Sequence, residues 1–275
     1  MPLKKKLQAF RKKLKWLDPF TYVDLLLEKY WPAKHGKKTD VQEIGYTLVY
    51  IVSAFIFAFL IYQFFALALQ TNSPIVIVIS ESMEPNLYRG DVVFIQGASF
   101  ASLKAQELFV PENVSGKLFS EFAEASYSPS QVSNAGKELS AIQAGGKEIK
   151  PSQDGDINLY YSSFTGEQII HRVVAKLNAL DASFLLTKGD NEKTNWTFDQ
   201  DCGKKIQEPI LGTDTSRIII EKPCITLYPL KISEIEGKAV FRIPIIGCVK
   251  VWVFDDLPSL ISKGAMPEHY NGGLC

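Results

Sequence analysis

Serine, histidine and aspartate side chains in this sequence have the types needed for nucleophilic acyl transfer at neutral pH. Ser82 follows the apolar run 75–79, His171 lies in Ile-Ile-His-Arg-Val-Val, and Asp190 lies in Thr-Lys-Gly-Asp-Asn. In such a centre the serine hydroxyl attacks a carbonyl, the imidazole takes its proton, and the carboxylate orients the imidazole. The combination predicts a hydrolase whose chemistry needs no cofactor and no metal ion.

His171 favours a catalytic role over a purely structural one. The chain has three histidines, His35, His171 and His269, and His171 is flanked by isoleucines and valines. A lone histidine in such a strand is usually a core residue with satisfied hydrogen bonds, and a serine at a strand end usually just meets water. Taken together, an imidazole in a β-core and a strand-end serine are typical of a general base and its nucleophile.

A second hydroxyl accompanies the candidate nucleophile. Ser80 precedes Ser82 by two positions, so both side chains are expected on the same face of an extended strand. The Ser82 backbone N–H and the Ser80 hydroxyl are therefore candidates to stabilise an oxyanion.

Three aspartates are candidates for the residue that orients the histidine. Asp190 lies in a Gly-Asp-Asn sequence that, taken by itself, is more typical of an ordinary turn, and Asp199 and Asp201 follow nine and eleven residues later. Asp199 and Asp201, together with Asn191 and Asn195, suggest a calcium loop, but the ligand spacing and the glycine of an EF-hand are absent. The sequence leaves open which of the three acids acts.

A membrane-spanning helix is predicted over residues 44–69. This stretch contains no charged residue, and a bilayer core needs about 20 apolar helical residues. A buried helix of a soluble domain is the alternative, but such helices rarely stay apolar on every face. Residues 1–43 form a basic segment with eleven Lys or Arg against five Asp or Glu, although the whole chain has zero net charge.

This charge asymmetry predicts the orientation of the chain in the membrane. The positive-inside rule places the N-terminus in the cytoplasm and residues 70–275 outside, giving a single-pass protein. The basic segment is expected to contact anionic lipid headgroups, which is a simpler interpretation than binding nucleic acid.

Residues 70–275 are predicted to form a β-rich domain. Short runs of Val, Ile, Tyr and Phe alternate with turn residues. The predicted strands are 75–80, 92–96, 157–161, 169–177, 183–187, 217–220, 225–228, 238–243 and 248–254. Residues 98–150 have scattered helical spacing and are predicted to be a partly helical insertion, and 202–230 a second, smaller insertion. The 240–254 run is too short to span a membrane and is expected to be a strand that touches its surface.

The cysteines and two glycosylation motifs fit an oxidising compartment. A Cys202–Cys224 disulfide would cross-link the second insertion, although spacing alone does not fix the pairing. No Cys-x-x-Cys pair is present, so a zinc ribbon is not predicted. Asn113-Val-Ser and Asn195-Trp-Thr match N-glycosylation acceptors, a motif that also arises often by chance.

Six motifs, taken in order, resemble those of membrane-bound type I signal peptidases of the archaeal and endoplasmic-reticulum kind. Singly each motif is modest, but six in the right order are specific. They follow the apolar span and occupy residues 80–87, 89–94, 155–160, 170–174, 187–191 and 237–247. The resemblance covers most of residues 45–97, 151–201 and 232–253.

The resemblance implies a mostly β catalytic domain that follows one transmembrane helix and cleaves signal peptides from secreted preproteins. It implies Ser82 as nucleophile and His171 as general base, at the position where bacterial relatives have lysine. It implies small residues at the first and third substrate positions before the cut. Expected partners are signal-peptide-bearing preproteins, membrane lipids and the secretion translocon, at the cell membrane or the endoplasmic reticulum membrane, with no nucleic acid.

The sequence departs from the family pattern in three places. Glu81 stands where glycine is common, and its side chain is expected to point away from the nucleophile. Trp196 stands where a second aspartate usually follows Asp190 by about six residues, so a local insertion must bring Asp199 or Asp201 into register. The 98–150 insertion is longer than the family needs. Two alternatives remain: a catalytically silent, membrane-anchored subunit that binds secreted chains, and a specialised processing peptidase.

Overall fold

The computed structural model describes residues 18–32, 39–203, 205–209, 216–220 and 224–265. Most of the N-terminal basic segment, together with His35, His269 and Cys275, lies outside the described residues. The chain divides into two compact units, residues 1–68 and 69–275.

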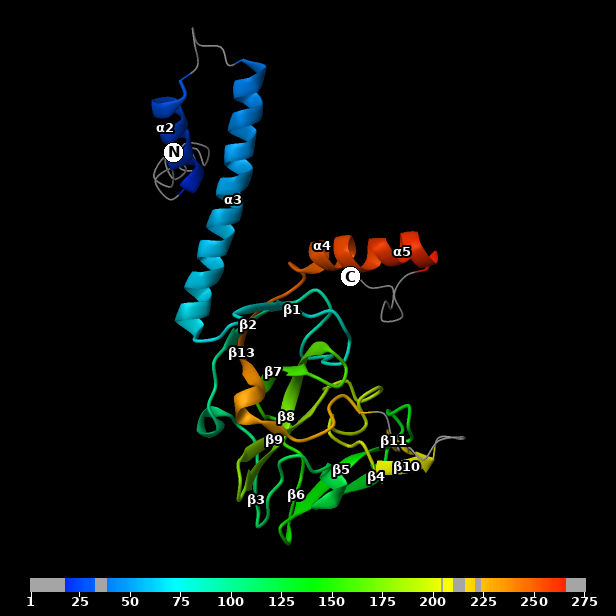
Figure 1. Ribbon diagram of the computed structural model, residues 1–275. Helices are drawn as coiled ribbons and strands as arrows, with labels where there is room; N and C mark the ends of the chain where they lie inside the picture. Colours follow the sequence, from blue (N-terminus) through cyan, green and yellow to red (C-terminus); the bar gives the residue numbers. More distant parts are fainter. Residues whose placement is uncertain (1–17, 33–38, 204, 210–215, 221–223, 266–275) are drawn as a thin grey trace, which may run out of the picture. The chain divides into compact units, whose positions relative to one another are not determined.

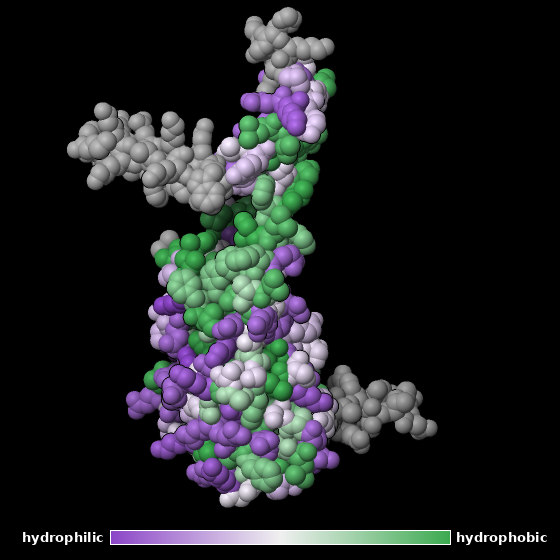
Figure 2. Space-filling view, turned by 90° about the vertical axis from the view of Figure 1, so that its left-hand side faces the viewer, coloured by the Kyte–Doolittle hydropathy of each residue, from purple (hydrophilic) through white to green (hydrophobic). Residues whose placement is uncertain are grey.

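The described residues of the first unit form two helices. Helix α2 (Pro19–Tyr30) begins after Asp18, whose carboxylate accepts a hydrogen bond from the Phe20 backbone N–H, and proline occupies its first position. Helix α3 (Asp40–Leu69) is long and apolar enough to cross a membrane by length and composition. Side chains of the two helices pack in a small cluster of Val23, Leu27 and Tyr46. Figure 2 shows an extensive hydrophobic surface on α3, whereas hydrophilic side chains are prominent on the second unit in this view.

The second unit is built on one eight-stranded sheet (Figure 1). Its main path runs β1–β2–β13–β7–β8–β9–β12, and β3 pairs in parallel with β8. The strands are β1 (Ile75–Ile77), β2 (Val92–Gln96), β3 (Glu107–Val110), β7 (Ile157–Ser162), β8 (Glu167–Ala179), β9 (Ser183–Lys188), β12 (Leu230–Lys231) and β13 (Ile235–Ile243). The predicted fold class, a mostly β domain that follows one apolar helix, is confirmed.

Strand β8 organises the sheet because it is long enough to change partners along its length. Its first half pairs with β7 from Glu167 to Arg172, and its second half pairs with β9 on the opposite edge, from Arg172 to Asn178. Buried apolar side chains lie on both faces of the sheet, as expected for a β-branched, hydrophobic strand in the middle of a domain.

The 98–150 insertion is mostly β, so the prediction of a partly helical segment was wrong. Apart from two 3-10 turns, Phe100–Ser102 and Phe119–Glu121, its regular structure is β3 and a separate three-stranded sheet. That sheet consists of β4 (Ala123–Pro129), β5 (Lys137–Ala144) and β6 (Lys147–Ile149). Gly145 and Gly146 both have positive φ and form the two-residue turn between β5 and β6. The scattered leucine and phenylalanine spacing was misleading, and the Gly-Gly pair was the better signal.

Two predicted strands are also absent. Residues 225–228 form no strand, and 248–254 are helical, in α4 (Cys248–Val251) and a π-helical turn η5 (Trp252–Asp256) that leads into α5 (Leu257–Lys263). Strand β13 ends at Ile243, directly before Pro244, which has no N–H to continue the ladder. The second insertion contains a hairpin of β10 (Lys205–Pro209) and β11 (Ser216–Ile220). The predicted Cys202–Cys224 disulfide is present.

Candidate active site

Ser82 lies in a turn that follows strand β1. The strand ends at Ile77, earlier than predicted, and the chain then crosses to a turn that begins at Ser82. Two backbone hydrogen bonds, from Val78 N–H to the Asp91 carbonyl and from Gly90 N–H to the Val78 carbonyl, hold the approach to this turn. Met83 is fully buried in the core beneath it. Ser82 is therefore fixed by its neighbours on both sides.

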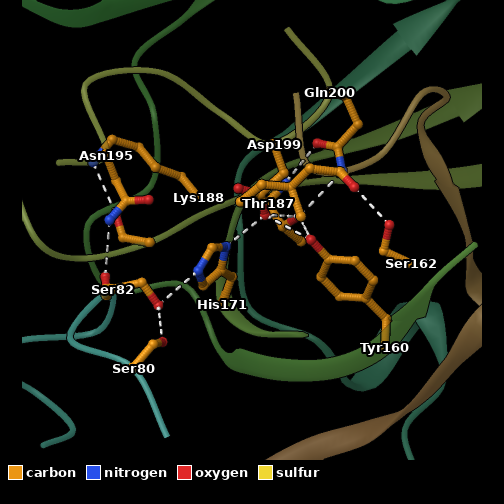
Figure 3. Close-up of polar contacts among 12 residues, drawn as sticks. Ser80, Ser82, Tyr160, Ser162, His171, Thr187, Lys188, Asn195, Asp199 and Gln200 are labelled. Atoms are coloured by element: carbon orange, nitrogen blue, oxygen red, sulfur yellow. Dashed lines mark hydrogen bonds and ion pairs between the residues drawn. The ribbon is translucent and has the colours of Figure 1, made fainter. Parts of the chain in front are cut away.

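His171 lies on β8 with its ring directed at Ser82 (Figure 3). Its Nε2 atom is 3.0 Å from the Ser82 hydroxyl oxygen, and its Nδ1 atom is 2.7 Å from Oδ2 of Asp199. The side chain is buried, with 2% of the residue exposed. With its proton on Nδ1, where it donates to the carboxylate, the neutral ring leaves Nε2 free to accept the serine proton, and these distances fit that tautomer.

Asp199 accepts three hydrogen bonds on one carboxylate oxygen. Besides the His171 ring, the Tyr160 hydroxyl donates to Oδ2 over 2.8 Å and the Thr187 hydroxyl over 2.6 Å. The Asp199 backbone N–H also donates to the Thr187 carbonyl, and all these groups are buried. Burial, and next the charge of Asp199, raise the pKa of Tyr160 well above its usual value, so this phenol stays a donor.

The other two candidate aspartates bind different partners. Asp190 forms a two-point ion pair with Arg172, at 2.7 and 2.6 Å, and accepts a hydrogen bond from the Asn86 amide. Asp201 accepts hydrogen bonds from Tyr127 and Thr197. Of the three acids, the structure brings Asp199 alone to His171.

One loop contacts both the serine and the histidine. We name residues 189–202 the acid loop. The Asn191 backbone N–H donates to the Ser82 carbonyl over 2.9 Å, and the Asn195 side-chain amide donates to the same oxygen over 3.2 Å. A Cβ atom at Gly189 would lie 2.6 Å from that carbonyl oxygen, so only glycine fits there without a shift.

Sequence reasoning did not identify Asn191 or Asn195 as site residues. Asn191 was considered as part of a turn, Asn195 as a glycosylation acceptor, and both as members of a calcium loop that the ligand spacing did not favour. The Asn195 amide nitrogen is instead engaged with Ser82 and with the Thr194 hydroxyl. Nothing in the local pattern signals these contacts, because Ser82 is more than one hundred residues away along the chain.

Two further groups lie beside the site. The Ser80 hydroxyl oxygen is 3.2 Å from that of Ser82, so the two serines are neighbours, as predicted. Lys188 donates to the Gly189 carbonyl, and burial lowers the pKa of its ammonium group. In the described part of the chain, no group of three or more His, Cys, Asp or Glu side chains is placed to hold a metal ion.

No protein-family model matches the chain. Among curated proteins, it is 28% identical over 136 residues to the signal peptidase complex catalytic subunit sec11 of Schizosaccharomyces pombe, covering 50% of this chain and 55% of that protein. It is 24% identical over 210 residues to the signal peptidase complex catalytic subunit SEC11 of Saccharomyces cerevisiae, covering 76% of this chain and 83% of that protein. The chain therefore spans about half the length of the first relative and most of the second.

Proposed function

We propose that this chain, a homologue of the signal peptidase I-like proteins of the endoplasmic-reticulum type, is a membrane-bound serine endopeptidase that removes signal peptides from secreted preproteins. The observation that carries the proposal is the continuous hydrogen-bonded path from the Ser82 hydroxyl through the His171 ring to the Asp199 carboxylate. This is the arrangement that activates a serine for acyl transfer.

The proposed reaction follows from these contacts. The Ser82 oxygen attacks the carbonyl carbon of the scissile bond while Nε2 of His171 takes the hydroxyl proton. The Asp199 carboxylate stabilises the imidazolium that forms. The imidazolium then gives its proton to the leaving amine, and the C–N bond breaks to leave an acyl ester on Ser82. A water molecule, deprotonated by His171, hydrolyses the ester and restores the serine.

The negative charge on the attacked carbonyl oxygen needs hydrogen-bond donors. Ser80 is the first candidate, because its hydroxyl lies against that of Ser82. The Ser82 backbone N–H is the second candidate, by analogy with other serine hydrolases.

Two open strand edges support an extended peptide substrate. β1 is the terminal strand of the main sheet. Residues 167–171 of β8 pair with β7 on one edge, and within the described residues no strand pairs with them on the β9 side. The hydrogen bond between His171 and Ser82, which follows β1 in the chain, places the proposed nucleophile beside the unpaired edge of β8. A peptide added to such edges would be bound by main-chain hydrogen bonds and read through alternate side chains.

The membrane part of the proposal rests on α3 and on the charge of the N-terminal segment. Helix α3 would anchor the chain in an endoplasmic-reticulum-type membrane, with the basic segment in the cytoplasm against anionic lipid and the β-domain outside. In that arrangement the site would meet preproteins delivered by the secretion translocon.

The silent-subunit alternative is less well supported, because a binding subunit has no need of a serine hydrogen-bonded to a buried His–Asp pair. The specialised-peptidase alternative differs only in substrate. Cleavage of a panel of preproteins, with and without small residues at the first and third positions before the cut, separates it from general signal-peptide processing.

The decisive test is cleavage of a labelled preprotein by the membrane-reconstituted chain. We expect Ser82→Ala and His171→Ala each to lower kcat by about 10⁴-fold or more. Ser163→Ala, a change at an exposed serine of the same unit, is the matched control and should behave as wild type. Cleavage at the correct site by Ser82→Ala would refute the proposal.

A further inference from the structure

The separate sheet β4–β6 contacts the acid loop. Two backbone hydrogen bonds join them, from Leu139 N–H to the Trp196 carbonyl over 2.9 Å and from Asn134 N–H to the Lys193 carbonyl over 3.0 Å. Leu139 lies on β5 and Asn134 in the connection between β4 and β5. The sheet thus binds the main chain of the loop at two points before it reaches Asp199.

Tyr127 of β4 closes a polar ring around the turn that carries Asp199. Its hydroxyl oxygen is 2.7 Å from the Thr197 hydroxyl and also binds the Asp201 carboxylate. The Thr197 hydroxyl donates to the same Asp201 oxygen over 2.9 Å. Asp199 lies midway between Thr197 and Asp201, so these three side chains fix both ends of its turn.

Aromatic and apolar contacts reinforce this attachment. The Tyr127 ring lies 5.4 Å from the Trp196 ring, and the Lys137 ammonium is 5.2 Å and 4.6 Å from the centres of these two rings. Phe198, two residues after Trp196, is buried. Its ring packs edge-on against that of Phe119, with 4.6 Å between the ring centres. Phe198 directly precedes Asp199, so its anchoring also sets where the carboxylate points.

We propose that the inserted β4–β6 sheet holds the acid loop in place, and that Tyr127 is the positioning residue through which it keeps Asp199 against His171. This inference rests on the proposed function. Its physical reason is that the acid loop has no strand or helix of its own, and a loop of this kind moves unless tertiary contacts restrain it. A His–Asp hydrogen bond of 2.7 Å requires the carboxylate to stay in one place.

Tyr127→Phe is the sharpest test because it removes one hydroxyl and keeps the ring that packs on Trp196. We expect kcat for preprotein cleavage to fall about tenfold with KM unchanged, since the contacts of the hydroxyl with Thr197 and Asp201, which fix the turn of Asp199, are lost while substrate contacts are not. Tyr161→Phe, at an exposed tyrosine of β7, is the matched control and should keep the wild-type kcat.

Thr197, whose hydroxyl contacts that of Tyr127, provides a second variant. Thr197→Val removes the hydroxyl that meets Tyr127 and keeps the shape of the side chain, whereas Thr197→Ser keeps the hydroxyl. We expect Thr197→Val to lower kcat about as much as Tyr127→Phe, and Thr197→Ser to restore most of the activity. Because both changes break one network, the double variant Tyr127→Phe/Thr197→Val should lose little more than either single variant.

A readout that needs no substrate separates this inference from the proposed function. The Nδ1 proton of His171, hydrogen-bonded to Asp199, is observed by proton NMR on the intact chain and is expected to broaden or disappear in Tyr127→Phe but not in Tyr161→Phe. Unchanged kcat and an unchanged proton signal in a folded Tyr127→Phe protein would overturn the inference. Cleavage by Ser82→Ala would instead overturn the proposed function, whatever the state of this proton.

Discussion

The substitution Asp199→Asn tests the site most directly, because it removes a charge and keeps the shape of the side chain. In the asparagine variant, either the amide oxygen or the amide nitrogen takes the place of Oδ2. That position faces three donors, His171 Nδ1–H, the Tyr160 hydroxyl and the Thr187 hydroxyl. Placing the amide nitrogen there would set donors against donors, so we expect the amide oxygen to occupy it and the histidine tautomer to be kept.

The expected loss then comes from the missing charge alone. Two unit charges about 4 Å apart attract by about 4 kcal/mol at an effective dielectric constant of about 20. Without this attraction the imidazolium that forms in the transition state is less stable, and 4 kcal/mol corresponds to about a 10³-fold loss of rate. A reversed tautomer, in which Nε2 carries the proton and cannot accept that of Ser82, would cost about 10⁴-fold instead.

The measurement is single-turnover cleavage of a preprotein, which reports the chemical step without product release. Asp190→Asn is the matched comparison, because Asp190 binds Arg172 rather than the histidine. We expect Asp190→Asn to lower the unfolding temperature, because it weakens the ion pair with Arg172, and to change the cleavage rate much less than Asp199→Asn does. Less than a tenfold loss in Asp199→Asn would refute the assignment of Asp199, and a loss of 10⁴-fold or more would refute the argument from the three donors.

Three further predictions concern the surroundings of the site. Replacing Cys202 and Cys224 by serine should destabilise the protein by about 3 kcal/mol, given a sequence separation of 22 residues. Reductant should lower the unfolding temperature of wild type more than that of the variant, in which Cys248 is still disulfide-bonded. Gly189→Ala should lower kcat at least tenfold in the cleavage assay, because the new Cβ would press on the carbonyl oxygen of the proposed nucleophile; wild-type kcat would contradict the close approach. Hydrogen bonds from Ser115, and then from nearby backbone N–H groups, lower the pKa of Asp181, so its carboxylate stabilises the fold above the unfolded-state pKa of 3.8. The difference in unfolding temperature between wild type and Asp181→Asn should therefore be full near neutral pH and shrink as the pH falls below 3.8, and a difference independent of pH would exclude this role.

The sequence was sufficient for the elements whose pattern is local. The apolar span, the main strands and the neighbouring Ser80 and Ser82 hydroxyls all follow from short-range composition and alternation, which depend little on distant contacts. The strand prediction for residues 248–254 was wrong because it, too, relied on local composition alone. Their apolar, β-branched composition suits a strand, but Pro244 ends the β-ladder before they begin, and the buried ion pair of Arg89 with Asp256 fixes the helical segment that follows.

The choice among the three aspartates could not be made from the sequence. Asp190, Asp199 and Asp201 differ little in local composition, and each ends in a different polar network. Which network contains His171 depends on the path of the acid loop, and that path depends on contacts with the β4–β6 sheet. The sheet carries no motif of its own and was itself predicted incorrectly, so its influence on the loop had no signal in the chain.

The acid loop links the proposed nucleophile and the proposed base to one structural element. Through Asn191 and Asn195 it holds the carbonyl of Ser82, and through Asp199 it holds the ring of His171. A displacement of this loop would therefore disturb both partners of the serine–histidine hydrogen bond together. Strand β8, by contrast, is held by regular strand pairing, with β7 up to Arg172 and with β9 from Arg172 onward. The precision of the site thus depends most on its least regular segment, which is why contacts remote from the reacting atoms, such as that of Tyr127 with Thr197, are expected to affect the rate.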